Sequence, residues 1–291
     1  MQYSLVERAE CRFPEMPGTE TLQEPIARMK ILITGERGML GRTLKETLAK
    51  HHAIVGLESW DGGHVDRILH CLVRHPYHSP EQIIESNINF LPTLRDLYCQ
   101  SQAKDVIYFS SIVVYGNRAS GCQEEESLIA PGDLYALSKS FGEEYLRAHE
   151  IPGITLRIPA IIEPNSRRNL ISRIISDIAE DRSLLLQHLD KPFNALIAGE
   201  CIAAFLDQLP ILQGSRQTYN LMASPECTLE EICRYVANRF RRPLRLVSER
   251  ETSPHRYFSV RRLRTFLGFQ TGDARVQLEL SHALPRESTR E

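Results

Sequence analysis

The sequence predicts an α/β protein with a doubly wound parallel sheet and a smaller, mixed α/β lobe at its C-terminal end. Three observations predict this fold class. Short apolar runs alternate with stretches of helical periodicity over residues 29–164. A glycine-rich turn follows the first apolar run and opens the first helix. Past residue 164, helical segments interleave with shorter strand candidates.

The composition is that of an ordinary globular protein: 42% of the 291 residues are hydrophobic, and 35 basic residues stand against 37 acidic ones. No run of 18 apolar residues occurs, and residues 1–28 carry prolines and glutamates instead of the apolar core of a secretory leader. The seven cysteines include no CxxC pair, which favours reduced thiols. We therefore expect a cytoplasmic protein without a membrane partner, with residues 1–28 as a flexible appendage.

The first predicted domain covers residues 29–164. Its first strand is residues 31–33, and Leu40, Leu44 and Leu48 mark the buried face of the helix that follows. The remaining elements keep the alternation, with strands at 53–57, 68–73, 106–109 and 154–158 and helices at 80–100 and 134–149. Because strands that alternate with helices pair in parallel, both faces of this sheet should be covered.

The second predicted unit is mainly residues 165–291, with segments near 195–222 returning to the first domain. Its elements are helices at 170–179, 198–209 and 229–240 and strands at 184–186, 218–221 and 244–247. Ten arginines, two glutamates and no lysine lie between Arg234 and Arg264. This basic stretch is either a solvated face or a surface for an anionic small molecule such as a nucleotide diphosphate. No nucleic-acid recognition motif accompanies it, so no nucleic-acid partner is predicted.

The first chemical signal is the segment 34–41, TGERGMLG, between the first strand and the first helix. Gly35, Gly38 and Gly41 allow a tight turn and a close approach of the backbone to a ligand. The helix N-terminus offers unpaired N–H groups to a pyrophosphate. The spacing alone also fits a purely structural turn, but its place between a strand and a helix favours the binding role.

Two further signals lie downstream. Tyr135 and Lys139 are four residues apart on one predicted helix, so the ammonium group can lower the pKa of the phenol and make it a proton donor and acceptor. Ser110 and Ser111 end an apolar strand, at the sheet edge where ligands of parallel sheets bind. Taken singly, the first pair also fits a surface tyrosine beside a solvated lysine, and the serines also fit a turn or a cap.

The order of glycine loop, strand-end serine and Tyr-x-x-x-Lys resembles the extended short-chain dehydrogenase/reductase superfamily, in particular the NAD-dependent epimerase/dehydratase family. The resemblance spans about residues 30–269 and includes segments 89–93 (NFLPT), 156–157 (LR), 219–221 (YNL), 228–232 (TLEEI) and 267–269 (LGF). It implies a Rossmann-type fold that binds NAD(P) and transfers a hydride to or from a small-molecule substrate. It also implies a homodimer packed through helices near 89–97 and 135–146.

The resemblance implies roles for single residues. Ser111, Tyr135 and Lys139 match the catalytic positions, with Tyr135 as the acid/base and Lys139 orienting the nicotinamide ribose. Cofactor contacts are expected from Gly35, Arg37, Gly38, Met39, Leu40, Gly41, Glu58, Leu72, Ser110, Tyr135, Lys139, Ile158 and Pro159. Substrate contacts are expected from Ser111, Ile112, Tyr135, Asn169 and Arg250.

The sequence departs from the family pattern after the second strand. Only eight residues separate Glu58 from Arg67, where the family has another strand and helix, so the adenine side of the cofactor pocket should be more open. Glu58 lies where an acid binds the ribose 2′-hydroxyl of NAD. Arg37 resembles the loop arginine of GDP-fucose synthases and can equally meet the 2′-phosphate of NADP. The sequence leans to NAD.

The expected substrate contacts are altered as well. Phe193 replaces the phosphate-binding arginine of many UDP-sugar epimerases, and Ala160 replaces their asparagine, which leaves Arg250 as the expected diphosphate ligand. Ile112 and Val113 stand where sugar dehydratases have an Asp-Glu pair, so dehydration is disfavoured.

These observations predict an NAD(P)-dependent epimerase or ketoreductase that acts on a nucleotide-diphosphate sugar, or a similar polar carbonyl or alcohol, with Tyr135 as acid/base. The alternative is a non-catalytic NAD(P)-binding module with a regulatory or partner-binding role, suggested by the missing strand and helix. Retention of Ser111, Tyr135 and Lys139 favours the enzyme. His75 and His78 are expected to be surface histidines, because no further metal ligands accompany them, and no metal is predicted.

Overall fold

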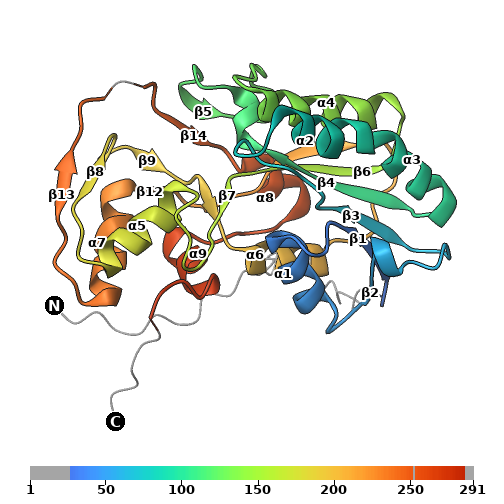
Figure 1. The fold of residues 1–291 in the computed structure, drawn as a ribbon, viewed down its shortest axis with the longest axis horizontal. Coiled ribbons are helices and arrows are strands. Elements are labelled where there is room, and N and C mark those ends of the chain that lie inside the picture. The colour runs from blue at the N-terminus through green and yellow to red at the C-terminus, as the bar shows by residue number, and fades with distance from the viewer. Residues whose placement is uncertain (1–26, 252, 286–291) are drawn as a thin grey trace, which may run out of the picture.

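The structure is a computed structural model that describes residues 27–251 and 253–285. The appendage expected at residues 1–28 therefore lies almost wholly outside the described residues. Figure 1 shows a large sheet flanked by helices on the right and a smaller lobe of helices and short strands on the left.

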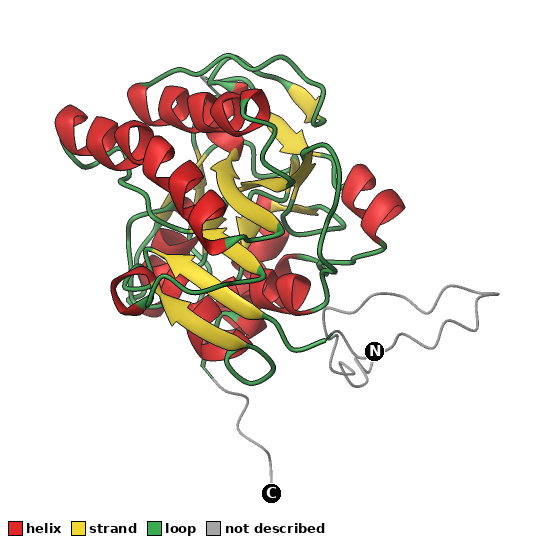
Figure 2. Ribbon diagram, turned by 90° about the vertical axis from the view of Figure 1, so that its right-hand side faces the viewer, coloured by secondary structure: helices red, strands yellow, loops and turns green. Residues whose placement is uncertain are grey.

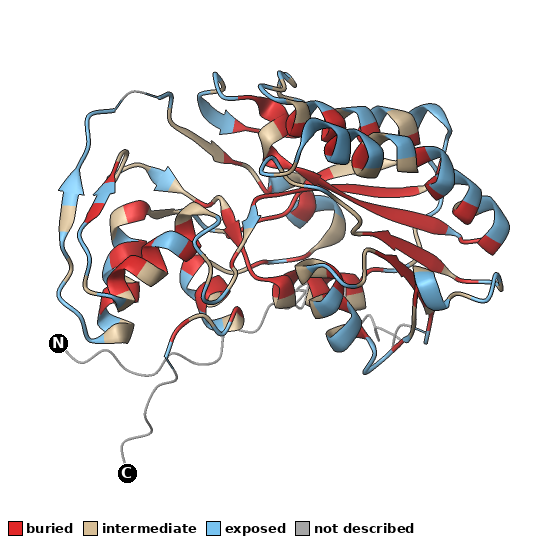
Figure 3. Cartoon of the chain, in the orientation of Figure 1, coloured by how far each residue is buried: buried red, intermediate tan, exposed pale blue. Residues whose placement is uncertain are grey.

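Six parallel strands form the large sheet, in the order β11-β6-β4-β3-β1-β2. Their bounds are β1 Lys30–Thr34, β2 Ala53–Gly56, β3 Arg67–His70, β4 Asp105–Ser111, β6 Gly153–Ile158 and β11 Gln217–Asn220. β3, β4 and β6 are buried along their whole length (Figure 3), as expected for strands covered on both faces. The prediction of a doubly wound α/β fold is confirmed.

Helices cover both faces of the sheet (Figure 2), and alternate side chains of β1 belong to two separate cores. Ile31 and Ile33 pack in one core with α1 (Met39–Leu48) and α6 (Gly199–Asp207). Leu32 packs in the other core with Leu91 and Leu94 of α3 (Phe90–Ser101) and Leu146 of α4 (Leu134–Ala148). Because successive side chains of a strand point to opposite faces of the sheet, β1 packs against a layer of helices on each face.

The helix expected at 80–100 is interrupted. α2 (Pro80–Ile84) runs into a π-helical turn (Glu85–Asn89) before α3 begins. Pro92 in the first turn of α3 has no N–H to donate, and its ring displaces the carbonyl four residues earlier, which favours the wider turn. The buried side chain of Asn87 fixes that turn through hydrogen bonds with the backbone of Arg74 and the hydroxyl of Ser138.

The strand order reverses at β1: β2 pairs with one edge of β1, and β3 and the strands that follow continue from the other edge. In open parallel sheets, ligands bind outside the carboxyl ends of the strands near such a reversal. Within the described residues, β2 is the last strand on its side, and a 3₁₀ turn (Leu57–Ser59) and a loop lead from it to β3. The additional strand and helix are absent here, as the short spacing predicts.

The C-terminal lobe has its own core, built on α5 (Leu170–Ala179), α7 (Leu229–Phe240) and α9 (Ala274–Leu280). Four two-stranded ladders lie in this lobe and where it meets the large sheet: β5 (Gly121–Gln123) with β14 (Arg256–Phe258), β7 (Ala160–Ile161) with β10 (Leu196–Ile197), β8 (Leu184–Leu186) with β13 (Leu246–Ser248), and β9 (Pro192–Phe193) with β12 (Cys227–Thr228). α8 (Arg261–Leu267) follows β14. α6 and β11 pack with the large sheet although they lie within this part of the chain.

Candidate active site at the carboxyl edge of the sheet

The glycine loop joins β1 to α1 and lies against the segment that follows β3. Gly35 has a φ of 74°, and a Cβ on it would lie 2.7 Å from the backbone nitrogen of Leu72. A Cβ on Gly41 would overlap the carbonyl oxygen of Gly35. The packing of the loop itself therefore requires these two glycines, and Leu72, expected beside the cofactor, contributes its backbone to that packing.

Gly38 differs from the other two glycines. A Cβ on it would meet only the Gly35 carbonyl oxygen, at 3.3 Å. Gly38 is the N-cap of α1, and no side chain caps the N–H groups of the first turn, where Met39 and Leu40 lie. The space beside Gly38, together with the positive end of the helix dipole, suits a pyrophosphate.

Arg37 forms an ion pair with Glu58. In the sequence, Arg37 is the residue that favours NADP and Glu58 the residue that favours NAD. Arg37 is in the glycine loop, and Glu58 is in the 3₁₀ turn after β2. Both side chains are exposed. The guanidinium that would attract a 2′-phosphate is therefore already next to a carboxylate.

Tyr135 lies in the first turn of α4, which begins where the Asp133 carboxylate accepts a hydrogen bond from the backbone N–H of Ala136 at 2.8 Å. Its phenol is hydrogen-bonded to the hydroxyl of Ser111 at the end of β4. Tyr135 is only 9% exposed, and this burial raises the pKa of its phenol to about 12, while the bond to Ser111 acts in the opposite direction. The structure thus brings two of the three expected catalytic groups into contact.

Lys139 follows Tyr135 by one turn of α4 and is buried. Its Nζ donates a hydrogen bond to the carbonyl oxygen of Phe109 at 2.8 Å and lies 5.1 Å from the centre of the Tyr108 ring. Burial lowers the pKa of Lys139 to about 8, against the opposing effects of Cys71 and Glu143. The expectation that Lys139 lowers the pKa of the Tyr135 phenol is wrong for this arrangement, because burial dominates both groups.

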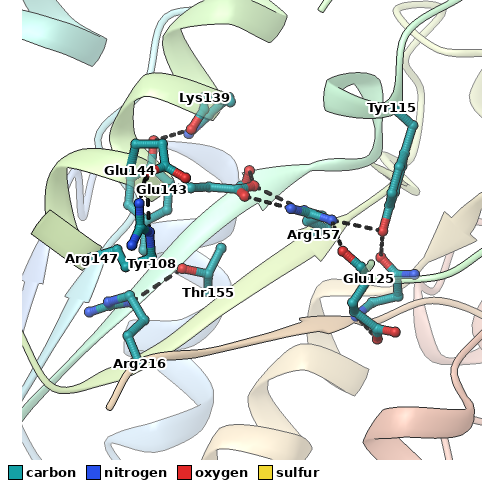
Figure 4. Close-up of polar contacts among 12 residues, drawn as sticks. Tyr108, Tyr115, Glu125, Lys139, Glu143, Glu144, Arg147, Thr155, Arg157 and Arg216 are labelled. Atoms are coloured by element: carbon teal, nitrogen blue, oxygen red, sulfur yellow. Dashed lines mark hydrogen bonds and ion pairs between the residues drawn. The ribbon is translucent and has the colours of Figure 1, made fainter. Parts of the chain in front are cut away.

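A buried polar network lies behind these residues (Figure 4). Arg157 on β6 donates to both carboxylate oxygens of Glu143 on α4, at 3.1 and 2.8 Å, and to the hydroxyl of Tyr115 at 3.1 Å. Ser110 donates to Glu143 at 2.5 Å. The hydroxyl of Ser110, expected in the nicotinamide pocket, is thus held by a carboxylate inside the fold.

Known proteins resemble this chain in sequence profile and in fold. The profile of the NAD dependent epimerase/dehydratase family matches residues 58–192. The resemblance to this family is confirmed. No curated protein sequence matches the chain.

Several solved structures share the fold. UDP-N-acetylglucosamine 4-epimerase from Methanobrevibacter ruminantium M1, in complex with UDP-N-acetylmuramic acid, aligns with a TM-score of 0.73 at 16% identity, covering 89% of this chain and 97% of that one. The Bordetella bronchiseptica enzyme WbmG, in complex with NAD and UDP, aligns with a TM-score of 0.73 at 16% identity over 88% and 94% of the two chains. RMD from Pseudomonas aeruginosa, complexed with NADPH, gives 0.70 at 18% identity over 87% and 97%. At these identities the likeness establishes the fold.

Two substrate contacts expected from the family pattern are placed differently. Arg250 is exposed in the segment between β13 and β14, and among the described residues it forms no hydrogen bond or ion pair. Asn169 caps α5: its side chain accepts from the N–H of Ser172 and donates to the carbonyl of Ile161, both at 2.9 Å. The exposure of Arg250 does not favour its predicted role as a diphosphate ligand, and the Asn169 side chain is occupied by a structural role.

Arg256 is the arginine of the same segment that reaches inward. It lies on β14, partly buried, and donates a hydrogen bond to the carbonyl oxygen of Gly116 in the loop after β4. Burial lowers the pKa of its guanidinium. Within residues 27–251 and 253–285 no ion pair joins either arginine to an acid, but Arg256 is partly buried whereas Arg250 is exposed, so Arg256 is the better candidate for an anionic ligand.

The remaining expected residues border the same sheet edge. Ile112 begins the 3₁₀ turn after β4, and Ile158 and Pro159 mark the end of β6. All three are buried. Phe193, the replacement for the family's arginine, packs against the core of the C-terminal lobe.

His75, predicted to be a surface histidine, instead lies beside Tyr135. Its ring centre lies 5.6 Å from that of Tyr135, and its side chain is partly buried. The sequence signal for this contact is positional, because His75 follows a strand whose carboxyl end reaches the same sheet edge. No group of three metal-binding side chains occurs in the described part of the chain.

None of the helices in the described ranges is long and apolar enough to cross a membrane. Six cysteines fall in these ranges and all six are free thiols.

Proposed function

We propose that this protein is an NAD(P)-dependent enzyme that acts on a nucleotide-diphosphate sugar, as an epimerase or a ketoreductase. One observation carries the proposal: Ser111, Tyr135 and Lys139 gather at the carboxyl edge of the sheet, beside the open N-terminus of α1. The family profile and the fold shared with NAD- and NADPH-bound structures support it.

The glycine loop fits a dinucleotide. Gly38 leaves room for the pyrophosphate, and the N–H groups of Met39 and Leu40 would bind it, while Gly35 and Gly41 shape the loop. Leu72, Ile158 and Pro159 are the proposed neighbours of the nicotinamide. When bound, NAD(P) supplies a hydride acceptor and donor. We favour NAD, because Glu58 holds Arg37 and would repel a 2′-phosphate.

Tyr135 is the proposed acid/base. With its pKa near 12 the phenol is protonated at neutral pH, so it is ready to donate a proton to a developing alkoxide, and Ser111 can bind the same substrate oxygen. Lys139, with a pKa near 8, is mainly cationic at neutral pH, and its proposed role is to orient the nicotinamide ribose.

The proposed substrate class follows from two features. The structures that share the fold include complexes with UDP and UDP-sugars. Arg256, half-buried without an acidic partner among the described residues, is the proposed ligand for the diphosphate in place of Arg250. The proposal also includes a homodimer and a cytoplasmic location, the latter supported by the free cysteines.

The test begins with calorimetric titration of the full chain with NAD and NADP, followed by turnover assays with UDP-glucose, UDP-N-acetylglucosamine and UDP-glucuronate. Tyr135→Phe should keep the NAD affinity and lower turnover at least ~100-fold, because it removes the proton donor alone. Tyr145→Phe, further along the same helix, is the matched control. NAD binding without turnover in the wild type would instead support the non-catalytic module, which the missing strand and helix beside β2 suggest.

A further inference from the structure

His75 lies on the segment that leaves the carboxyl end of β3. Its ring is tilted by 34° against the ring of Tyr135, with the centres 5.6 Å apart. A tight turn fixes its backbone: the N–H of His75 donates to Nδ1 of His78 at 3.2 Å, and its carbonyl accepts from the N–H of His78 at 3.0 Å. The imidazole is therefore held next to the proposed acid/base.

Two further side chains extend this contact toward solvent. Tyr77 also stacks on His75, with the ring centres 5.5 Å apart and an interplanar angle of 20°. The guanidinium of Arg168 lies over the Tyr77 ring at 5.4 Å. Because Arg168 comes from the segment between β7 and α5, the ladder of rings joins two loops above the site.

The chemistry of the imidazole is set by this position. Burial lowers the pKa of His75 to about 4, and the charges of Lys139, His78 and Arg168 act in the same direction, against Glu163. At neutral pH the ring is therefore uncharged and carries one N–H donor and one acceptor nitrogen. Within the described ranges, neither ring nitrogen has a hydrogen-bond partner.

We propose that His75 is a substrate-contacting residue that binds a ring hydroxyl of the nucleotide sugar beside the carbon at which Tyr135 acts. This inference rests on the proposed function. A hydroxyl is both donor and acceptor and so matches the neutral imidazole, whereas a carboxylate offers acceptors only.

The experiment compares His75→Phe, His75→Gln and the wild-type full chain loaded with NAD. Phenylalanine keeps the stacking with Tyr77 and Tyr135 but has no nitrogen. We expect the KM for UDP-glucose to rise about 2- to 12-fold, the range for one neutral hydrogen bond, with kcat and NAD affinity near wild type. Glutamine should recover part of the loss. His149→Phe is the matched control, because His149 stacks on Tyr145 beyond the far end of α4.

An unchanged KM for UDP-glucose and UDP-N-acetylglucosamine in an active His75→Phe enzyme would overturn the role of His75 and leave the proposed function standing. Equal losses in the phenylalanine and glutamine variants, with no recovery, would also overturn it, since packing alone would then explain the effect. A wild-type protein that binds NAD but turns over no sugar of the panel would overturn the proposed function, and this inference with it.

Discussion

Gly38 and Gly41 belong to one loop, yet their surroundings predict opposite effects of a side chain. The position of Gly38 is open apart from one oxygen at 3.3 Å, whereas a Cβ on Gly41 overlaps the backbone. Gly38→Val should keep the melting temperature and abolish NAD(P) binding, because the side chain fills the place of the pyrophosphate. Gly41→Val should lower the melting temperature by at least ~2 °C. Thermal unfolding and calorimetric titration of both variants measure this.

Wild-type NAD affinity in a stable Gly38→Val variant would remove the glycine loop from the binding site. Equal melting temperatures of the two variants would show that the loop adapts to side chains at either place.

Lys139 makes stability depend on pH. Its pKa is lowered to about 8 in the folded protein from an ordinary value of 10.5, so the unfolded chain binds more protons between these values and stability rises with pH there. Raising the pH from 8 to 9.5 should stabilise the wild type relative to Lys139→Met by about 1–2 kcal/mol. Urea unfolding of both proteins at the two pH values measures the difference. A constant difference would mean that Lys139 titrates near its ordinary value.

At the level of elements, α4 is fixed to β6 by the ion pair of Glu143 and Arg157, whose side chains are 9% and 4% exposed. Arg157→Met should lower the free energy of unfolding by about 3–5 kcal/mol, because it leaves a buried carboxylate without its cation. Arg147→Met removes the partner of Glu144 on the exposed side of the same helix (Figure 4) and should leave stability nearly unchanged.

Chemical denaturation of both variants measures these two changes in the free energy of unfolding. The double variant Arg157→Met/Glu143→Leu should recover part of the loss, because the unpaired charge is gone. Equal stability of the two single variants would mean that water reaches the buried pair.

Elements with local signals could be predicted from the sequence. α7 has the bounds predicted because Thr228 and Glu231 form a capping box, and α5 because Asn169 caps an amphipathic helix. The ladder of β5 with β14 joins segments far apart in the chain and has too few residues for a periodic pattern. The π-helical turn depends on Pro92 and on tertiary bonds of Asn87, which no local pattern reveals.

The same division holds within the candidate site. The glycine loop, Ser111, Tyr135 and Lys139 could be named because their spacing carries the signal. The contact of His75 with Tyr135, the engagement of Ser110 by Glu143 and the exposure of Arg250 depend on how distant segments pack, so spacing could not predict them.

On the scale of the whole molecule, half of the ten arginines in the basic stretch between Arg234 and Arg264 form ion pairs. Its ion pairs are Arg234 with Glu230, Arg239 with Glu279, Arg245 with Asp181, Arg261 with Glu124, and Arg262 with Glu126. All five of these acids lie outside the stretch, so acids elsewhere in the fold balance part of its excess charge. The interpretation as a solvated face therefore accounts for most of it, with Arg256 as the exception.

The proposed homodimer has a candidate surface on α4. Leu137 and Phe141 are 53% and 47% exposed one turn apart, and Ile84 on the neighbouring α2 is 39% exposed. Leu137→Glu together with Phe141→Glu should convert a dimer into a monomer, because the charges cannot be buried unpaired. Light scattering coupled to gel filtration measures the mass. Phe266→Glu, 71% exposed on α8, is the control. A wild-type monomer would contradict the prediction.

Because the described sheet ends at β2, the two halves of a bound dinucleotide would contribute unequally to the binding free energy. The adenosine half extends from the reversal at β1 toward the β2 side, where the described residues supply no further strand. The pyrophosphate and nicotinamide half would then contribute a larger share of the binding free energy than in a full doubly wound sheet. Selection against a nicotinamide mononucleotide, which lacks the adenosine half, would be correspondingly weaker.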